Sequence, residues 1–182
     1  MRVSFIKKLM QLSPLTMTDL YFSPQVVASN QRSLKRLHRA ISLSQGQFSL
    51  IVACCNNQAL RQQMAEKLED LFSGQIQELV LNPSFQKLYT TIQANCQECQ
   101  PQALMIFGLE SIEKVDPLLV STNLVRNEFG KKFSFPVVLW VNDETLRKLV
   151  RLAPDFKSWA ASTIRFVATE YANPKPLTYK LA

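Results

Sequence analysis

Glycine, histidine and acidic side chains are scarce in this chain, and each scarcity removes a class of function. The 182 residues include four glycines, one histidine and 14 acidic residues against 21 basic ones, for a net charge of +7. The single histidine, His38, lies in an N-terminal segment away from the expected ligand crevice, so a Ser-His or Cys-His pair is not expected. No two acidic residues have a spacing that favours paired-carboxylate chemistry. We therefore expect no catalytic residues.

Long apolar runs are also missing. No run approaches the ~20 residues that a membrane span needs, and the N-terminus lacks the apolar core and cleavage site of a secretory signal. Apolar residues still make up 47% of the chain, which is enough for a globular core. We expect a cytoplasmic protein without a membrane span.

The four cysteines fit neither two disulfides nor a metal site. Cys54 and Cys55 end an expected strand, whereas Cys96 and Cys99 come late in a helix that leads to the opposite edge of the sheet. That separation makes a four-cysteine zinc site awkward. Cys96 and Cys99 have redox spacing, but they lie near a helix C-terminus, where thiol pKa values are not lowered. We expect reduced thiols and no metal.

Positive charge is concentrated at the N-terminus. Residues 1–40 hold seven basic residues and one acidic residue, a balance of +6, and the other 142 residues carry only +1. A solvated helix face is the simplest interpretation, and an anionic partner such as nucleic acid or a membrane surface is the alternative. The basic residues considered for contact with a partner are Arg32, Lys35, Arg36 and Arg39.

Beyond residue 47, strands and helices alternate with short connections. Three of the strands are almost continuous apolar runs, which indicates burial on both faces, as in a parallel sheet. The expected strands are 48–55, 76–81, 103–107, 137–141 and 164–168. Three helices are expected at 33–43, where the pattern is amphipathic, at 60–72 and at 116–133. A fourth is capped by Asn82-Pro83-Ser84 and runs to about residue 97, and a fifth, at 144–152, is capped by Asp143. These elements predict an α/β fold, a three-layer α/β/α sandwich with a mainly parallel five-stranded sheet. The domain would span residues 33–170, between a basic arm at 1–32 and an extended tail at 171–182.

In such a sheet, ligands bind beyond the carboxyl ends of the strands. The corner after the first strand reads Cys54-Cys55-Asn56-Asn57-Gln58-Ala59-Leu60-Arg61, without the glycines and lysine of a phosphate loop. Gly108 follows the third strand, at the place where a nucleotide hydrolase has an aspartate that binds magnesium. If ATP and Mg²⁺ bind here at all, the site is unconventional. Its candidate residues are Asn56, Asn57, Glu110 and Asn142. Glu110 has an ordinary alternative as a solvated residue, and Asn142 as a helix-capping residue.

Phe156 and Trp159 place two large rings in a segment expected to be a loop. They either close the edge of the sheet or form an anchor for a protein partner.

Several segments resemble the STAND class of P-loop signalling proteins, most of all the AAA-like domains that precede repeats in many bacterial, notably cyanobacterial, proteins. The matching stretches are Leu34-Lys35-Arg36-Leu37, Gln45 to Leu50, Pro101 to Ser111, Phe135 to Asp143, and Ala153-Pro154-Asp155-Phe156-Lys157-Ser158-Trp159. The resemblance covers about residues 33–168 and implies a P-loop-like fold with ATP-dependent switching. The phosphate loop and the magnesium aspartate depart from the family pattern, so the site is degenerate.

Three functions follow as expectations. The first is a non-catalytic regulatory or scaffold module that binds a protein partner and needs no cofactor. The second is an ATP-binding or ATP-hydrolysing signalling domain with an unconventional phosphate site. The third is a nucleic-acid binder that uses the basic N-terminal arm. The sequence specifies neither the partner nor the oligomeric state.

Overall fold

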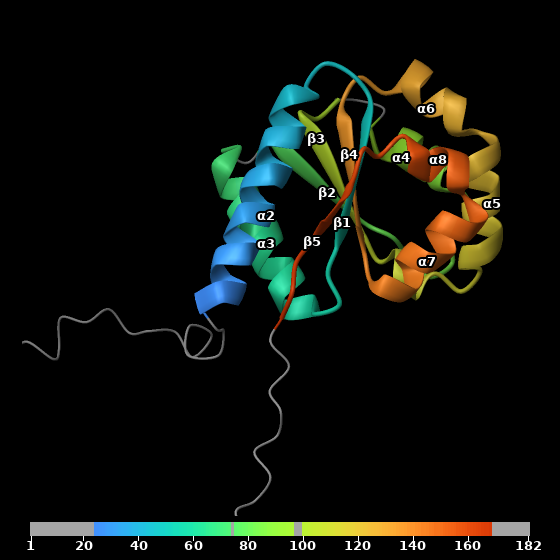
Figure 1. Ribbon diagram of the computed structural model, residues 1–182. Coiled ribbons are helices and arrows are strands. Elements are labelled where there is room, and N and C mark those ends of the chain that lie inside the picture. Colours follow the sequence, from blue (N-terminus) through green and yellow to red (C-terminus); the bar gives the residue numbers. More distant parts are fainter. Residues whose placement is uncertain (1–23, 74, 97–99, 169–182) are drawn as a thin grey trace, which may run out of the picture.

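A computed structural model describes residues 24–73, 75–96 and 100–168 (Figure 1). The predicted tail, most of the predicted basic arm, and Cys99 lie outside these residues. Among the described residues, no helix combines the length and the apolar character required to cross a bilayer.

The strands form one parallel sheet in the order β2-β3-β4-β1-β5. Its strands are β1 (Ser49–Cys54), β2 (Ile76–Val80), β3 (Ala103–Phe107), β4 (Pro136–Val141) and β5 (Thr163–Arg165). Every residue of β3 and β4 is buried. The apolar runs thus predicted a parallel α/β sheet correctly, because side chains on both faces of a covered sheet must be apolar.

Helices cover both faces of the sheet (Figure 1). One face carries α2 (Pro24–Leu43) and α3 (Gln58–Leu71), and the other carries the remaining helices. These are α4 (Leu88–Asn95), α5 (Val115–Leu124), α6 (Arg126–Lys132), α7 (Asp143–Leu152) and α8 (Pro154–Ser158), with the short 3-10 helix η1 (Leu109–Ser111) after β3. Two apolar cores result, one on each side of the sheet. Trp140 belongs to the core under α2 and α3, where its ring stacks on Phe107.

Four local expectations were wrong. The amphipathic helix begins at Pro24 rather than at residue 33, and its polar residues Asn30 and Ser33 are buried, where they bind the backbone of Val167 and Arg165. Asn82 does not cap a helix; its side chain accepts a hydrogen bond from the Ser84 amide in a turn, and α4 begins later. The helix expected at 116–133 is two helices, α5 and α6. The segment with Phe156 and Trp159 is a short helix, α8, rather than a loop.

The topology creates a crevice between β1 and β4. These strands are neighbours, but the chain leaves β1 for α3 on one face and leaves β4 for α7 on the other. Adjacent strands whose connections diverge in this way mark the position where open α/β sheets bind ligands.

Candidate functional site

A pocket of about 560 Å³ opens at the carboxyl ends of β1, β4 and β5. It lies where open α/β sheets bind ligands, beyond the carboxyl ends of strands whose connections diverge. We call it the switch-point pocket; it is lined by Cys54, Asn56, Asn57, Asp143, Arg165, Phe166, Val167 and Ala168. Two of the sequence-predicted residues, Asn56 and Asn57, lie in it.

Asn57 is occupied in capping α3. Its Oδ1 atom accepts a hydrogen bond from the Leu60 amide at 2.8 Å, as expected of an asparagine at a helix N-cap. One of the amides that would face a phosphate at this helix N-terminus is therefore already satisfied. The side chain of Asn57 is therefore used to cap α3.

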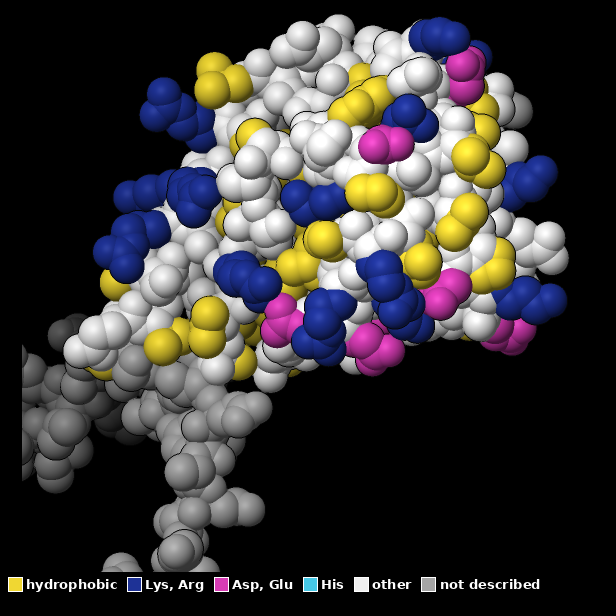
Figure 2. Space-filling model, turned by 45° about the vertical axis from the view of Figure 1, so that its right-hand side comes forward, with side chains coloured by type: hydrophobic (Ala, Val, Ile, Leu, Met, Phe, Trp, Pro, Cys, Tyr) yellow, Lys and Arg dark blue, Asp and Glu magenta, His cyan; other side chains and the backbone are white. Residues whose placement is uncertain are grey.

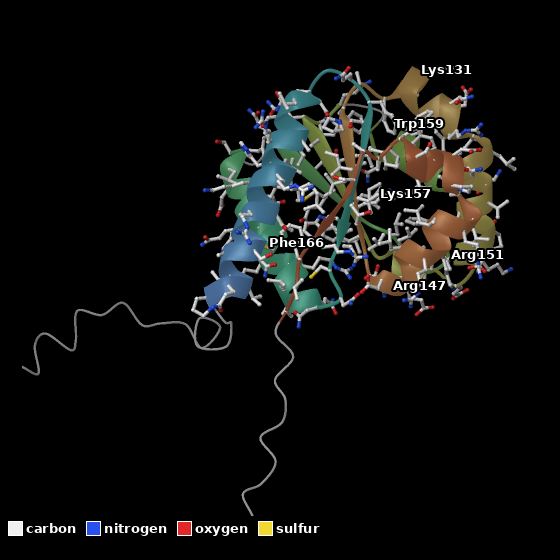
Figure 3. All side chains as sticks on the ribbon, viewed as in Figure 1. Lys131, Arg147, Arg151, Lys157, Trp159 and Phe166 are labelled. Carbon is white, nitrogen blue, oxygen red and sulfur yellow. The ribbon has the colours of Figure 1, made fainter. Side chains whose placement is uncertain are left out.

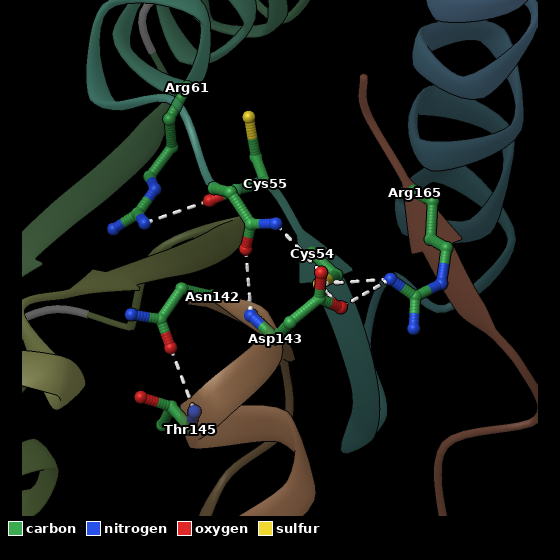
Figure 4. A network of polar contacts seen from close by, with 8 residues as sticks. Cys54, Cys55, Arg61, Asn142, Asp143, Thr145 and Arg165 are labelled. Atoms are coloured by element: carbon green, nitrogen blue, oxygen red, sulfur yellow. Dashed lines mark hydrogen bonds and ion pairs between the residues drawn. The ribbon is translucent and has the colours of Figure 1, made fainter. Parts of the chain in front are cut away.

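Asn142 has the same task at the start of α7. Its Oδ1 atom accepts a hydrogen bond from the Thr145 amide at 2.7 Å (Figure 4). The expectation that Asp143 caps this helix was wrong by one residue, because Asp143 is the first helical residue. In that position its carboxylate is still favourable, since negative charge is stabilised by the helix dipole at the N-terminus.

Asp143 joins β1, β4 and β5 through its side chain and backbone (Figure 4). Asn56 donates from Nδ2 to Asp143 Oδ2 at 2.7 Å, and the Asp143 amide donates to Asn56 Oδ1 at 2.8 Å. Arg165 donates from Nη1 to Asp143 Oδ1 at 2.6 Å, and the Cys54 thiol lies 3.5 Å from the same oxygen. We call Cys54, Asn56, Asp143 and Arg165 the Asp143 network.

The pKa values in this network follow from its contacts. The hydrogen bonds from Arg165 and then Asn56 lower the pKa of Asp143 to about 2, so its carboxylate is charged at neutral pH. Burial, followed by the nearby Asp143 charge, raises the pKa of Cys54 to about 11. Burial also raises the pKa of Cys55. Both thiols are therefore protonated at neutral pH and poorly suited to nucleophilic chemistry.

Arg61 replaces the lysine of a phosphate loop only in its charge. Its side chain is buried, where it pairs with Glu110 and donates from Nη2 to the Cys55 carbonyl at 2.9 Å. These contacts turn the guanidinium toward the protein. Glu110, a candidate residue of the nucleotide site, is likewise held as the partner of a buried cation.

Gly108 is required by the backbone at its position. Its φ of +83° lies in the left-handed region, and a Cβ atom there would lie 3.0 Å from the Leu81 carbonyl oxygen. An aspartate would therefore meet the end of β2 as well as an unfavourable φ. The glycine that stands in place of a magnesium ligand thus has a structural reason.

The described residues contain no group of three or more His, Cys, Asp or Glu side chains arranged to hold a metal ion. Cys54 and Cys55 are buried free thiols, and Cys96 is also buried. The Cys96–Cys99 pair cannot be placed, because Cys99 lies outside the described residues.

The residues considered for contact with a partner divide into two groups. Arg32, Lys35, Arg36 and Arg39 are all exposed on α2. Phe156 is fully buried against Phe129, whereas Trp159 is 38% exposed beside α8 (Figure 3). Of the two rings, only Trp159 reaches the surface.

Sequence reasoning missed Arg165 and Arg61 as parts of this region. Arg165 lies in a short strand and Arg61 in an amphipathic helix, and neither position carries a local motif. Their roles arise from partners distant along the chain, Asp143 and Glu110.

Neither models of known protein families nor curated proteins match this chain. The resemblance to the STAND class therefore rests on the stretches quoted for it. The structure itself shows a parallel five-stranded α/β domain.

Proposed function

We propose that this domain is a non-catalytic regulatory or scaffold module, descended from a P-loop nucleotide hydrolase, that acts by binding a protein partner. The observation that carries the proposal is that the polar side chains around the switch-point pocket already bind one another or cap helices. Asn57 and Asn142 cap helices, Asn56 and Arg165 bind Asp143, and Glu110 binds Arg61. A nucleotide would have to break these contacts to obtain its own.

Charge supports the same conclusion. Among the described residues that line the switch-point pocket, the charged ones are Arg165 and Asp143, which lie at hydrogen-bond distance from each other. A phosphate placed against Arg165 would approach the Asp143 carboxylate, which the low pKa keeps charged. Phosphate sites instead concentrate positive charge and backbone amides.

Exposed apolar side chains offer anchors for a protein partner. Leu124 on α5 is 75% exposed, and it lines a cavity of about 240 Å³ between α4 and α5 together with Tyr89 and Val125. Trp159 exposes part of its ring near α6 and α8 (Figure 3). Large apolar and aromatic side chains of this kind supply much of the binding energy in protein interfaces.

Two measurements test the proposal. One is an equilibrium titration with ATP and Mg²⁺ in which calorimetry detects binding, and the other is a phosphate-release assay. We expect neither saturable binding in the micromolar range nor turnover. Micromolar binding that is lost in Asn56→Ala or Glu110→Gln would instead establish the ATP-binding function.

Partner binding has its own test. We expect wild type and Leu43→Asp to capture the same protein from a native lysate, and Leu124→Asp to fail to capture it. Leu43 is the matched control, because it is also highly exposed but lies on α2, on the other face of the sheet. Equal capture by both variants would contradict a role for the Leu124 surface.

A further inference from the structure

Four cations form one row on the outer face of α2. Arg32, Lys35, Arg36 and Arg39 follow the spacing i, i+3, i+4 and i+7, which places them on the same side of a helix. All four are exposed, whereas Asn30, Ser33, Leu37 and Ile41 are buried. We call these four residues the α2 cation row.

The charge of this row is uncompensated within the described residues. The sequence of α2 contains no acidic residue, and no ion pair joins a row member to a described carboxylate. To another described residue, Arg36 of the row donates a side-chain hydrogen bond, from Nη2 to Ser162 Oγ at 3.3 Å.

On the opposite side of the domain, several cations are paired with carboxylates. Lys148 and Arg151 on α7 both reach Asp116, and Lys131 on α6 reaches Glu128. In Figure 2, Lys and Arg side chains gather along the α2 margin without an acidic neighbour, whereas those over α7 alternate with acidic side chains. Charge of one sign is therefore concentrated on α2, which is the electrostatic footprint of a surface for a polyanion.

The row is held in place by the edge of the sheet. Asn30 donates from Nδ2 to the Val167 carbonyl and accepts from the Val167 amide, each at 2.9 Å. Ser33 donates to the Arg165 carbonyl at 2.7 Å. These side chains satisfy the outer edge of the last strand and fix α2 against it. The cations are thus presented by an anchored helix, which limits the entropy lost when a ligand binds.

The chemistry of the row favours one polyanion over the others. Insertion into a membrane needs an apolar face, and the apolar face of α2 is buried in the core. Single-stranded nucleic acid needs exposed rings for stacking, but the row contains none and the nearby His38 ring packs on Phe72 at 4.8 Å. A protein interface needs apolar anchors at its centre, and the exposed apolar residues of α2, Val27 and Leu43, lie at its two ends. Backbone phosphates of a duplex require only cations.

We propose that the α2 cation row binds the phosphate backbone of double-stranded nucleic acid without reading its sequence. The row extends over about 10 Å of helix axis, which is comparable with the ~12 Å width of the major groove. Four phosphate contacts give a salt slope of about −3.6 for log K against log salt, so affinity falls roughly 100-fold between about 50 and 200 mM salt. The proposal does not depend on the proposed function, because none of the four cations lines the switch-point pocket or the cavity beside Leu124.

The test is fluorescence anisotropy of a labelled mixed-sequence duplex with the full chain, over a range of salt. The variant R32Q/K35Q/R36Q/R39Q removes the row. The matched control, K131Q/R147Q/R151Q/K157Q, removes the same number of charges from α6, α7 and α8, at positions shown in Figure 3. Circular dichroism checks that both variants fold.

We expect wild type and control to bind with the same steep salt slope, and the row variant to lose both the affinity and the slope. Equal losses in the two variants would overturn the proposal, since net charge alone would then account for binding. The proposal would also be overturned if wild type bound no duplex but bound vesicles containing phosphatidylserine, or self-associated in sedimentation, and the row variant lost that binding or association.

Discussion

Replacing Gly108 with alanine tests whether this position is reserved for glycine by the backbone. Gly108 and Gly46 both have left-handed φ values, +83° and +79°. Alanine in that region is destabilising by about 1–2 kcal/mol, of which about 0.4–1 is offset by the reduced entropy of the unfolded chain. We therefore expect Gly46→Ala, which adds a Cβ with nothing within 4 Å, to lower the free energy of unfolding by about 1 kcal/mol or less.

Gly108→Ala has an additional penalty. Its Cβ would lie 3.0 Å from the Leu81 carbonyl oxygen and 3.4 Å from the Leu81 nitrogen. Leu81 cannot withdraw freely, because its amide donates to the Phe107 carbonyl at 2.9 Å. Overpacking of this kind typically adds about 1–3 kcal/mol, so we expect a total loss of about 2–4 kcal/mol.

The assay is urea unfolding of wild type, Gly46→Ala and Gly108→Ala, with the slope compared to verify that the midpoint reports stability. Gly108→Asp should be destabilised in the same way and should gain no affinity for Mg²⁺. If Gly108→Ala were no less stable than Gly46→Ala, the contact with the end of β2 would not constrain this position, and the structural reason for the missing aspartate would be refuted.

Three further predictions concern the polar groups of the site. Glu110→Leu should lower the free energy of unfolding by about 2–3 kcal/mol, because it leaves the buried Arg61 unpaired. The double variant with Arg61→Leu should recover part of the lost stability. A loss in the double variant as large as the sum of the two single losses would contradict this pairing. Asp143→Asn should lower the free energy of unfolding by about 1 kcal/mol at neutral pH. The full pKa shift corresponds to about 2.5 kcal/mol, but the carboxylate is 39% exposed and solvent screening reduces that value. Because the folded pKa lies below the unfolded one, the stabilisation is present above the unfolded pKa of about 3.8 and is lost as pH falls through about 2; equal pH dependence of wild type and Asp143→Asn in denaturant titrations would argue against it. Cys54 should react with a thiol reagent only after unfolding, as mapped by peptide mass spectrometry, and rapid labelling of the native protein at neutral pH would count against its raised pKa.

The strands of this fold could be predicted because their signal is local. The runs that became β1, β3 and β4 are apolar almost throughout, and only a sheet covered on both faces accommodates such runs. The order of the strands had no such signal, because it depends on pairing between segments distant along the chain.

The start of α2 and the helix α8 were missed for a different reason. Asn30 and Ser33 are polar and interrupt the apolar pattern, yet they are buried because they bind the backbone of the last strand. Phe156 belongs to a helix of five residues, too short for a periodic pattern, and its ring is buried by contacts with Phe129 and its neighbours. Tertiary contacts decided all three positions.

The sequence indicated where Asn56 lies in the fold but not what it contacts. Asn56 was placed at the carboxyl end of the first strand, where the structure has it. Its partners Asp143 and Arg165 come from β4–α7 and β5, and nothing near Asn56 in the sequence indicates that they meet. Sequence reasoning therefore recognised a missing phosphate loop without recognising the network that occupies its position.

The most direct test of the account is the pKa of the Asp143 carboxyl in the folded protein, measured by carbon-detected NMR with and without ATP and Mg²⁺. The account predicts a value of about 2 that does not change when nucleotide is added, because Arg165 and Asn56 hold the carboxylate in both cases. A value near 3.8, or a nucleotide-dependent shift, would show that the Asp143 network is open to a ligand and would contradict the central claim.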